Sequence, residues 1–282
     1  MSAASSVQNT APSTAMTAPR IDAAFARLKA EGRKALIPFL TAGDPSLEAT
    51  VPVMHALVAA GADVIELGVP FSDPMADGPT IQRSSERALA RGAGMRYVLE
   101  AVAQFRRTDT TTPVVLMGYL NPVEIRGAEG FAAAAAEAGV DGVLLVDLPP
   151  EEAGELRAAF AARQLAIVLL ASPTTPEARV ARLCEDAAGY LYYVSFNGVT
   201  GASDRLDMRA AGGRLRQLRQ AAGVPVVAGF GIRDAASAVA MAAEADGVVI
   251  GSALVAELAA ASDPVRVAGD FLAPIRRALD GG

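Results

Sequence analysis

The stretch Gly139–Val146, which reads Gly-Val-Asp-Gly-Val-Leu-Leu-Val, contains the unit from which the fold can be argued. Its first glycine ends an alanine-rich helical pattern, as glycines at helix C-termini commonly do. The run Gly142–Val146 is apolar throughout, which is typical of a strand covered on both faces. The same succession begins again at Gly61 and at Ala222. Strands are predicted over Ala35–Leu40, Asp63–Leu67, Pro113–Met117, Gly142–Val146, Ala166–Leu170, Tyr190–Val194, Pro225–Ala228 and Gly247–Ile250.

Alanine-rich segments with apolar residues at helical spacing separate these strands, as in Leu47–Ala60, Glu151–Arg163 and Ala235–Ala245. Eight strands that alternate with helices, without a linker between two halves, predict an α/β fold of the (β/α)8 TIM-barrel type. We expect one extra helix before the first strand. The 282 residues suffice, since such a barrel takes about 250. An open doubly wound sheet is the alternative, but the turn Thr41–Pro45 lacks its usual G-x-G-x-x-G fingerprint.

Residues 1–20 differ from the rest of the chain. They are rich in Ser, Thr, Ala and Pro, contain no acidic residue and show no hydrophobic period. Such a segment cannot bury enough apolar surface to fold, and it lacks the basic start and apolar core of a secretory signal. We therefore predict a disordered N-terminal extension over residues 1–20 and a single barrel domain over residues 21–282.

Composition excludes several classes of function. Cys184 is the only cysteine and His55 the only histidine, so a Ser-His-Asp triad, a Cys-His pair and a multi-histidine metal site are not expected. The net charge of −6 argues against a nucleic-acid-binding surface. No apolar run reaches the roughly 18 uncharged residues that a membrane span needs. A soluble, cytoplasmic protein is expected.

The last three predicted strand-to-helix junctions are rich in glycine, at Asn197–Gly201, Gly229–Ile232 and Ile250–Ala253. Glycines let backbone N–H groups approach an anion closely, and a helix that begins at Ser252 would direct its positive end toward it. Barrel phosphate sites typically use the loops after strands seven and eight. A single loop of this kind can be an ordinary tight turn, whereas three in succession predict a phosphate site.

Glu66 lies near the C-terminal end of an apolar strand and should point into the mouth of the barrel. Burial beside apolar neighbours would raise its pKa and suit it to proton transfer near neutral pH. The alternative is a glutamate paired with a nearby arginine or lysine. Asp77 follows on the next loop, where it could instead cap a helix that begins at Gly78-Pro79. Asp73, before a proline, could simply brace a turn.

Three tyrosines lie on the sixth predicted strand. Tyr190 and Tyr192 share a face by the period of two, and Tyr192 is nearer the strand end, where it could reach a ligand. For Tyr190 and Tyr193 we expect packing alone.

With these residues in view, the chain resembles the tryptophan synthase alpha subunit family. Four runs carry the resemblance: Ile65–Pro74, Asp77–Gln82, Ile37–Pro45 and Leu116–Pro122. Val146–Pro149 and the three glycine-rich junctions follow in the expected order, so the resemblance extends from about Ile21 to the C-terminus. Phe196 stands where some members carry an arginine.

The resemblance implies retro-aldol cleavage of indole-3-glycerol phosphate to indole and glyceraldehyde 3-phosphate. Glu66 would be the catalytic acid and base, Asp77 would partner the indole N–H, and Tyr192 would support the site. The implied phosphate-binding residues are Gly201, Gly231, Gly251 and Ser252. The implied indole pocket consists of Phe39, Phe230, Met117 and Leu144. Asp73 and Thr200 would communicate with a beta subunit.

The resemblance also implies that this chain needs no cofactor. Indole would pass to a beta subunit that uses pyridoxal phosphate, within an α2β2 complex. The chemistry fits the residues. Protonating indole C3 creates a cation that accepts the electrons of the breaking C–C bond, and a carboxylate near N1 stabilises this charge.

Three alternatives remain. The first is another phosphate-binding barrel enzyme, such as a sugar-phosphate isomerase or an aldolase. A Schiff-base aldolase would need a lysine at a strand end, but Lys29 and Lys34 both precede the first strand. A barrel that acts mainly as an allosteric activator of a beta subunit would have no need of Glu66 and Asp77. A stand-alone lyase that releases indole is the third.

Overall fold

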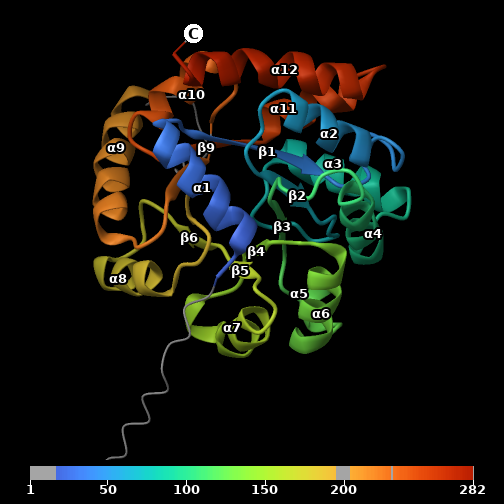
Figure 1. Cartoon of the computed structure of the whole chain (residues 1–282), viewed down its shortest axis with the longest axis horizontal. Helices are drawn as coiled ribbons and strands as arrows, with labels where there is room; N and C mark the ends of the chain where they lie inside the picture. The colour runs from blue at the N-terminus through green and yellow to red at the C-terminus, as the bar shows by residue number, and fades with distance from the viewer. Residues whose placement is uncertain (1–16, 195–203, 230, 282) are drawn as a thin grey trace, which may run out of the picture.

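Nine short parallel strands curl into a nearly closed barrel with the helices outside (Figure 1). This computed structural model describes residues 17–194, 204–229 and 231–281, and only the backbone of residues 204–211. The strands are β1 (Ala35–Thr41), β2 (Ile65–Gly68), β3 (Val114–Gly118), β4 (Gly142–Leu145), β5 (Ala166–Ile167), β6 (Leu169–Ala171), β7 (Leu191–Val194), β8 (Val226–Gly229) and β9 (Gly247–Ile250). The sheet order is β5-β4-β3-β2-β1-β9-β8-β7-β6. The predicted TIM barrel is confirmed.

Helices cover the outside of the sheet. They are α1 (Pro19–Glu31), α2 (Thr50–Ala59), α3 (Pro79–Ala90), α4 (Met95–Phe105), α5 (Asn121–Glu124), α6 (Ala128–Ala138), α7 (Gly154–Ala161), α8 (Glu177–Asp186), α9 (Asp204–Ala221), α10 (Ala235–Ala242), α11 (Ser252–Ala260) and α12 (Pro264–Leu279), with a 3-10 turn at Pro150–Glu152. Within the described ranges, none of them is both long and apolar enough to cross a membrane.

The fifth predicted strand, Ala166–Leu170, is interrupted at Val168. Its first part, β5, pairs with β4, and its second part, β6, pairs with β7. The N–H of Val168 still donates to the carbonyl of Val143 on β4, at 2.9 Å. The strand therefore changes partner where the barrel closes, and two observed segments correspond to one predicted strand.

Side chains alternate between two cores along each strand. On β1, Leu36 and Leu40 belong to the core between sheet and helices, whereas Ile37 and Phe39 belong to the barrel interior. All seven residues of β1 are buried as a result. This arrangement explains why the strand sequences are apolar throughout rather than alternating.

Helix α1 crosses one end of the barrel (Figure 1). The interior core includes its N-cap residue Ala18 and three residues of the helix, Ile21, Phe25 and Leu28. The arginines of α1 bind groups that lie just before strands: Arg20 bonds Asp141 and the carbonyl of Thr110, and Arg27 bonds Asp63. The closed end is therefore the N-terminal end of the strands, and the loops that follow the strands surround the other end.

The start of α1 differs from the predicted boundary at residue 21. The helix begins at Pro19, because proline suits a first helical position, and Arg20 forms an ion pair with Asp141 at 2.8 Å. Ala18 is fully buried, so the folded part begins before Ile21. The rest of the predicted extension, residues 1–16, lies outside the described residues.

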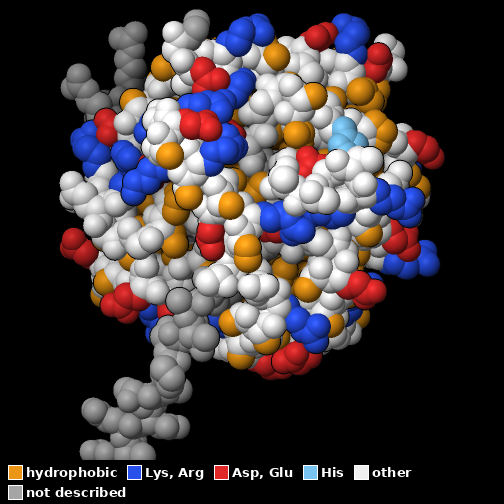
Figure 2. All heavy atoms as spheres, viewed as in Figure 1, with side chains coloured by type: hydrophobic (Ala, Val, Ile, Leu, Met, Phe, Trp, Pro, Cys, Tyr) orange, Lys and Arg blue, Asp and Glu red, His pale blue; other side chains and the backbone are white. Residues whose placement is uncertain are grey.

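Three aspartates at the closed end, each one or two residues before a strand, make the same set of contacts. Each accepts a hydrogen bond from the backbone N–H at the start of a neighbouring strand and also pairs with arginine. The backbone bonds run from Leu36 to Asp63 at 3.0 Å, from Val114 to Asp141 at 2.8 Å and from Val226 to Asp246 at 2.9 Å. Acidic and basic side chains are accordingly interspersed on this face (Figure 2).

We predict that Asp141→Ala lowers the free energy of unfolding by about 3 to 5 kcal/mol, because it removes the closest carboxylate from the buried Arg106 and the acceptor of the Val114 N–H. Arg106 and Asp141 are 2.7 Å apart, and their side chains are 10% and 4% exposed. Urea unfolding measures the change. Asp270→Ala is the control, since Asp270 and Arg266 are both 67% exposed and such pairs contribute less than about 1 kcal/mol. Equal losses in both variants would contradict the prediction.

Candidate active site

Glu66 points into the barrel interior from β2. It is in register with Phe39 on β1 and Val115 on β3, which both belong to the interior core. The side chain is fully buried, and burial raises its pKa to about 7, against the opposing effect of a hydrogen bond from Tyr190. No described arginine or lysine forms an ion pair with Glu66, so the ion-pair alternative is not met. The carboxyl group can give up or accept a proton near neutral pH.

Tyr190, which directly precedes β7, is the hydrogen-bond partner of Glu66. Its hydroxyl donates to Oε1 of Glu66 at 2.6 Å, while Oε2 is buried and has no partner among the described residues. The expectation of packing alone was therefore wrong for Tyr190. The signal was in the sequence, since Tyr190 shares a strand face with Tyr192. Tyr193 is fully buried on the opposite face, in the core beneath the helices.

Tyr192 lies in the interior core with Glu66. Burial raises the pKa of Tyr192 well above its usual value, and the nearby Glu66 carboxyl group raises it further. The hydroxyl therefore remains a donor at neutral pH. The neighbouring strand accommodates the hydroxyl because residue 229 is a glycine. A Cβ at Gly229 would overlap the hydroxyl of Tyr192.

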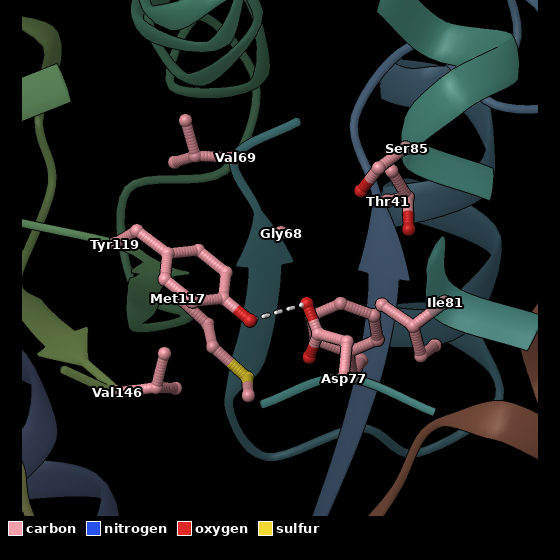
Figure 3. A pocket seen from close by; sticks show the side chains of 11 residues that line it. Thr41, Gly68, Val69, Asp77, Ile81, Ser85, Met117, Tyr119 and Val146 are labelled. Atoms are coloured by element: carbon pink, nitrogen blue, oxygen red, sulfur yellow. Dashed lines mark hydrogen bonds between the residues drawn. The ribbon is translucent and has the colours of Figure 1, made fainter. Parts of the chain in front are cut away.

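Asp77 lies on the loop between β2 and α3, at the open end of the barrel. Its Oδ2 accepts a hydrogen bond from Tyr119 at 3.1 Å, and the two side chains point toward each other across a pocket (Figure 3). Gly78, rather than Asp77, is the N-cap of α3, so the capping alternative is not met. Burial raises the pKa of Asp77, and the hydrogen bond from Tyr119 acts in the opposite direction.

The wall of this pocket is largely apolar. Two predicted indole-pocket residues, Phe39 and Met117, line it, whereas Leu144 is fully buried in the interior core and does not. A Cβ at Gly68 would lie 2.6 Å from the ring of Phe39, so glycine is needed there for the ring to lie flat on β2. Lining residues that we did not predict are Thr41, Gly68, Val69, Ile81, Ser85, Gly118, Tyr119 and Val146.

Two glycine-rich junctions are described at the same end. Gly231 follows β8 and has a φ of 70°, a conformation that favours glycine. Gly251 is the N-cap of α11, and the helix begins at Ser252 as predicted. A Cβ at Gly251 would lie 3.5 Å from Phe39, so this helix start adjoins the aromatic wall of the pocket. The N–H groups of its first turn are suited to an anion.

Asp73 is exposed on the loop after β2, where it accepts a hydrogen bond from Ser72. The turn-bracing alternative is partly met, since the carbonyl of Asp73 also accepts from the N–H of Met75 at 2.8 Å. The remaining predicted site residues lie outside the described residues, as does Phe196. They are Thr200, Gly201 and Phe230.

His55 and Cys184 take no part in the site. His55 lies on α2, with its ring 4.7 Å from that of Phe105, and Cys184 is a buried residue of α8. Across the described residues, no three His, Cys, Asp or Glu side chains are grouped as a metal site would require.

The family model described as tryptophan synthase alpha chain matches residues 25–274. The chain belongs to this family. It is therefore the indole-3-glycerol phosphate lyase half of a tryptophan synthase.

Individual relatives agree with the family. The alpha chain of Xanthomonas axonopodis pv. citri is 74% identical over 267 residues, which cover 93% of this chain and 99% of the relative. The crystal structure of the alpha subunit from Legionella pneumophila is 46% identical, with a TM-score of 0.87 over 93% of this chain and 99% of that one. A Mycobacterium tuberculosis tryptophan synthase chain is 36% identical, with a TM-score of 0.84 over 93% and 98%.

The raised pKa of Glu66 predicts a pH-dependent stability. Because the folded pKa of about 7 exceeds the ordinary 4.5, the contribution is fully present below pH 4.5 and is lost as pH rises through 7. Between pH 4.5 and 8 the wild type should lose up to about 3 kcal/mol relative to Glu66→Gln. Urea unfolding at several pH values measures this difference. The exposed Glu100→Gln should follow the wild type, and parallel curves for all three proteins would refute the assignment.

Proposed function

We propose that this alpha chain cleaves indole-3-glycerol phosphate with Glu66 as the acid and base and Asp77 as the partner of the indole nitrogen. The observation that carries the proposal is the state of Glu66. It is fully buried in the barrel, its pKa is about 7, and its Oε2 has no partner among the described residues. A carboxyl group in this state can both donate and accept a proton at neutral pH.

The reaction begins when protonated Glu66 delivers its proton to indole C3. The indole becomes a cation whose charge is spread toward N1, and the carboxylate of Asp77 stabilises this charge through the N1–H. Glu66, now a carboxylate, takes the proton from the hydroxyl on the carbon attached to C3. The C–C bond breaks, its electron pair returns to the indole ring, and the aldehyde forms. Glu66 ends the cycle protonated, so protons and electrons balance without another reactant.

Phosphate and ring are held at two ends of one site. Gly231, Gly251 and Ser252 would bind the phosphate through backbone N–H groups, supported by the position of Gly251 at the start of α11. Gly201 would join them. The indole ring would occupy the apolar pocket that Phe39 and Asp77 both line. Phe39 also adjoins Gly251, so the pocket lies beside the start of α11.

The remaining assignments complete the indole site. Met117 would contact the ring, since it lines the pocket, and Leu144 would support the wall from the interior core. Phe230, which lies outside the described residues, would also line the indole pocket. Tyr192 would support Glu66, because its hydroxyl stays protonated beside that carboxyl group.

The partner is a beta subunit. An alpha chain implies such a partner, and we propose an α2β2 complex in which indole passes to a beta subunit that uses pyridoxal phosphate. The chain itself would need no cofactor, since every proton in the proposed cycle is moved by Glu66. Asp73 and Thr200 would communicate with the beta subunit, and the exposure of Asp73 supports this role.

Glu66→Gln tests the catalytic assignment. The substitution keeps the size of the side chain and a carbonyl oxygen for Tyr190, but it cannot transfer a proton at neutral pH. Indole release from indole-3-glycerol phosphate should fall by about a hundredfold or more, with substrate affinity largely retained. Release is measured in single turnover with wild type, Glu66→Gln and the control Glu100→Gln.

The outcomes distinguish the proposed role of Glu66 from the alternative functions. Loss of release only in Glu66→Gln supports the proposal. Full release by Glu66→Gln refutes the role of Glu66. If the wild type is silent alone but active with a beta subunit, the barrel acts as part of the complex. If the wild type releases no indole even with a beta subunit, but raises the activity of that subunit, the chain is mainly an allosteric activator.

Asp73→Ala tests the communication with the partner. Because Asp73 is exposed, the isolated variant should retain the fold and the indole release of the wild type. Stimulation of indole release by the beta subunit should fall by about fivefold or more. The measurement is a titration of each alpha chain with the beta subunit, and equal stimulation would contradict the assignment.

A further inference from the structure

We infer that Tyr119 is a positioning residue for this reaction, because its hydroxyl directs one oxygen of Asp77 and leaves the other for the indole N–H. The inference rests on the role proposed for Asp77. It assigns a function to a tyrosine that the motifs in the sequence did not single out.

The hydroxyl of Tyr119 joins two neighbouring residues of the loop after β2. It accepts a hydrogen bond from the N–H of Ala76 at 3.0 Å and donates to Oδ2 of Asp77 at 3.1 Å. A hydroxyl can accept and donate at once. The same atom therefore holds both the backbone and the carboxylate of this loop.

The tyrosine ring is itself held in place. Tyr119 directly follows β3 and is 4% exposed. Its ring stacks on Phe71, with the centroids 4.9 Å apart and the planes 24° from parallel. Asp77, in contrast, lies on a loop between β2 and α3. The strand end thus provides the rigid reference to which the loop carboxylate is tied.

Other contacts hold the Asp77 backbone but not its carboxylate. The side-chain amide of Gln82 donates to the carbonyl of Asp77 at 2.8 Å, and the N–H of Asp77 donates to the carbonyl of Pro74 at 3.1 Å. Among the described residues, Tyr119 alone forms a hydrogen bond with the carboxylate, through Oδ2. The direction of the carboxylate is therefore set by one hydroxyl group.

The same hydrogen bond favours the charged form of Asp77. Burial favours the neutral acid, and the hydroxyl of Tyr119 opposes this effect. Asp77 forms no ion pair with a described arginine or lysine. The titratable groups that act on this pair are Tyr119 itself, on Asp77, and Asp147, after β4, on Tyr119. Burial also raises the pKa of Tyr119, so its hydroxyl stays a donor. Without the hydroxyl of Tyr119, the pKa of Asp77 would be higher. The neutral acid would then persist to higher pH, and in that form Asp77 would not stabilise the indole cation.

Tyr119→Phe isolates the hydroxyl, because it keeps the ring and its stack on Phe71. We expect kcat/KM for indole-3-glycerol phosphate to fall about tenfold, as for the loss of one hydrogen bond to a charged group. The acidic limb of the kcat/KM profile should move to higher pH. Tyr97→Phe is the matched control, because the Tyr97 hydroxyl also makes two hydrogen bonds, to Leu47 and Thr50, and does not line the pocket. Its pH profile should be that of the wild type.

A double-mutant cycle shows whether Tyr119 acts through Asp77. The probe is indole-3-propyl phosphate, which keeps the ring and the phosphate but lacks the reacting hydroxyl groups. Calorimetry gives its affinity for wild type, Tyr119→Phe, Asp77→Asn and the double variant. We expect Tyr119→Phe to weaken probe binding when Asp77 is present. In the Asp77→Asn background, the same substitution should have no further effect on the affinity.

Two failures are distinguishable. If the wild type cleaves the substrate and Tyr119→Phe has the same kcat/KM and pH profile, the inference about Tyr119 is wrong and the proposed function stands. Equal weakening of probe binding in both backgrounds would also overturn it, since the tyrosine would then act independently of Asp77. If Asp77→Asn retains full activity, the role of Asp77 fails first.

Discussion

The side chains of Ala18, Ile21, Phe25 and Leu28 pack into the N-terminal end of the barrel and close it. Glu66 lies fully buried in the interior, where its carboxyl group has a hydroxyl partner and no counter-charge among the described residues. Its pKa rises because the charged form loses solvation. The closure of one end thus prepares a proton-transfer group for the other end, where the strand-to-helix loops gather.

Stability and function are separated along the barrel axis. At the closed end, Asp63, Asp141 and Asp246 bind strand N–H groups and arginines, and this network needs no exchange of protons. In the interior and at the open end, carboxyl groups have hydroxyl partners instead: Tyr190 for Glu66 in the interior and Tyr119 for Asp77 at the open end. An arginine would hold these carboxylates ionised, whereas a hydroxyl leaves Glu66 able to change its protonation state.

Repetition made the strands predictable. Each one is an apolar run after a helix end, and the barrel needs both faces of every strand buried, so pattern and fold agree. The prediction was incomplete where contacts distant in sequence contribute. The partner change at Val168 depends on where the barrel closes. The helix start at Pro19 had a local signal in the proline itself, and the ion pair of Arg20 with the distant Asp141 adds to it. Tyr190 was passed over because its bond to Glu66 spans the barrel.

The sequence by itself determined the fold class, the absence of histidine and cysteine chemistry, and the strand and loop on which Glu66 and Asp77 lie, because these follow from local pattern and residue type. Only the tertiary structure decided what surrounds the two carboxyl groups. A pKa depends on solvation and on atoms a few ångströms away in space, and Tyr190 and Tyr119 reach the two groups from other strands.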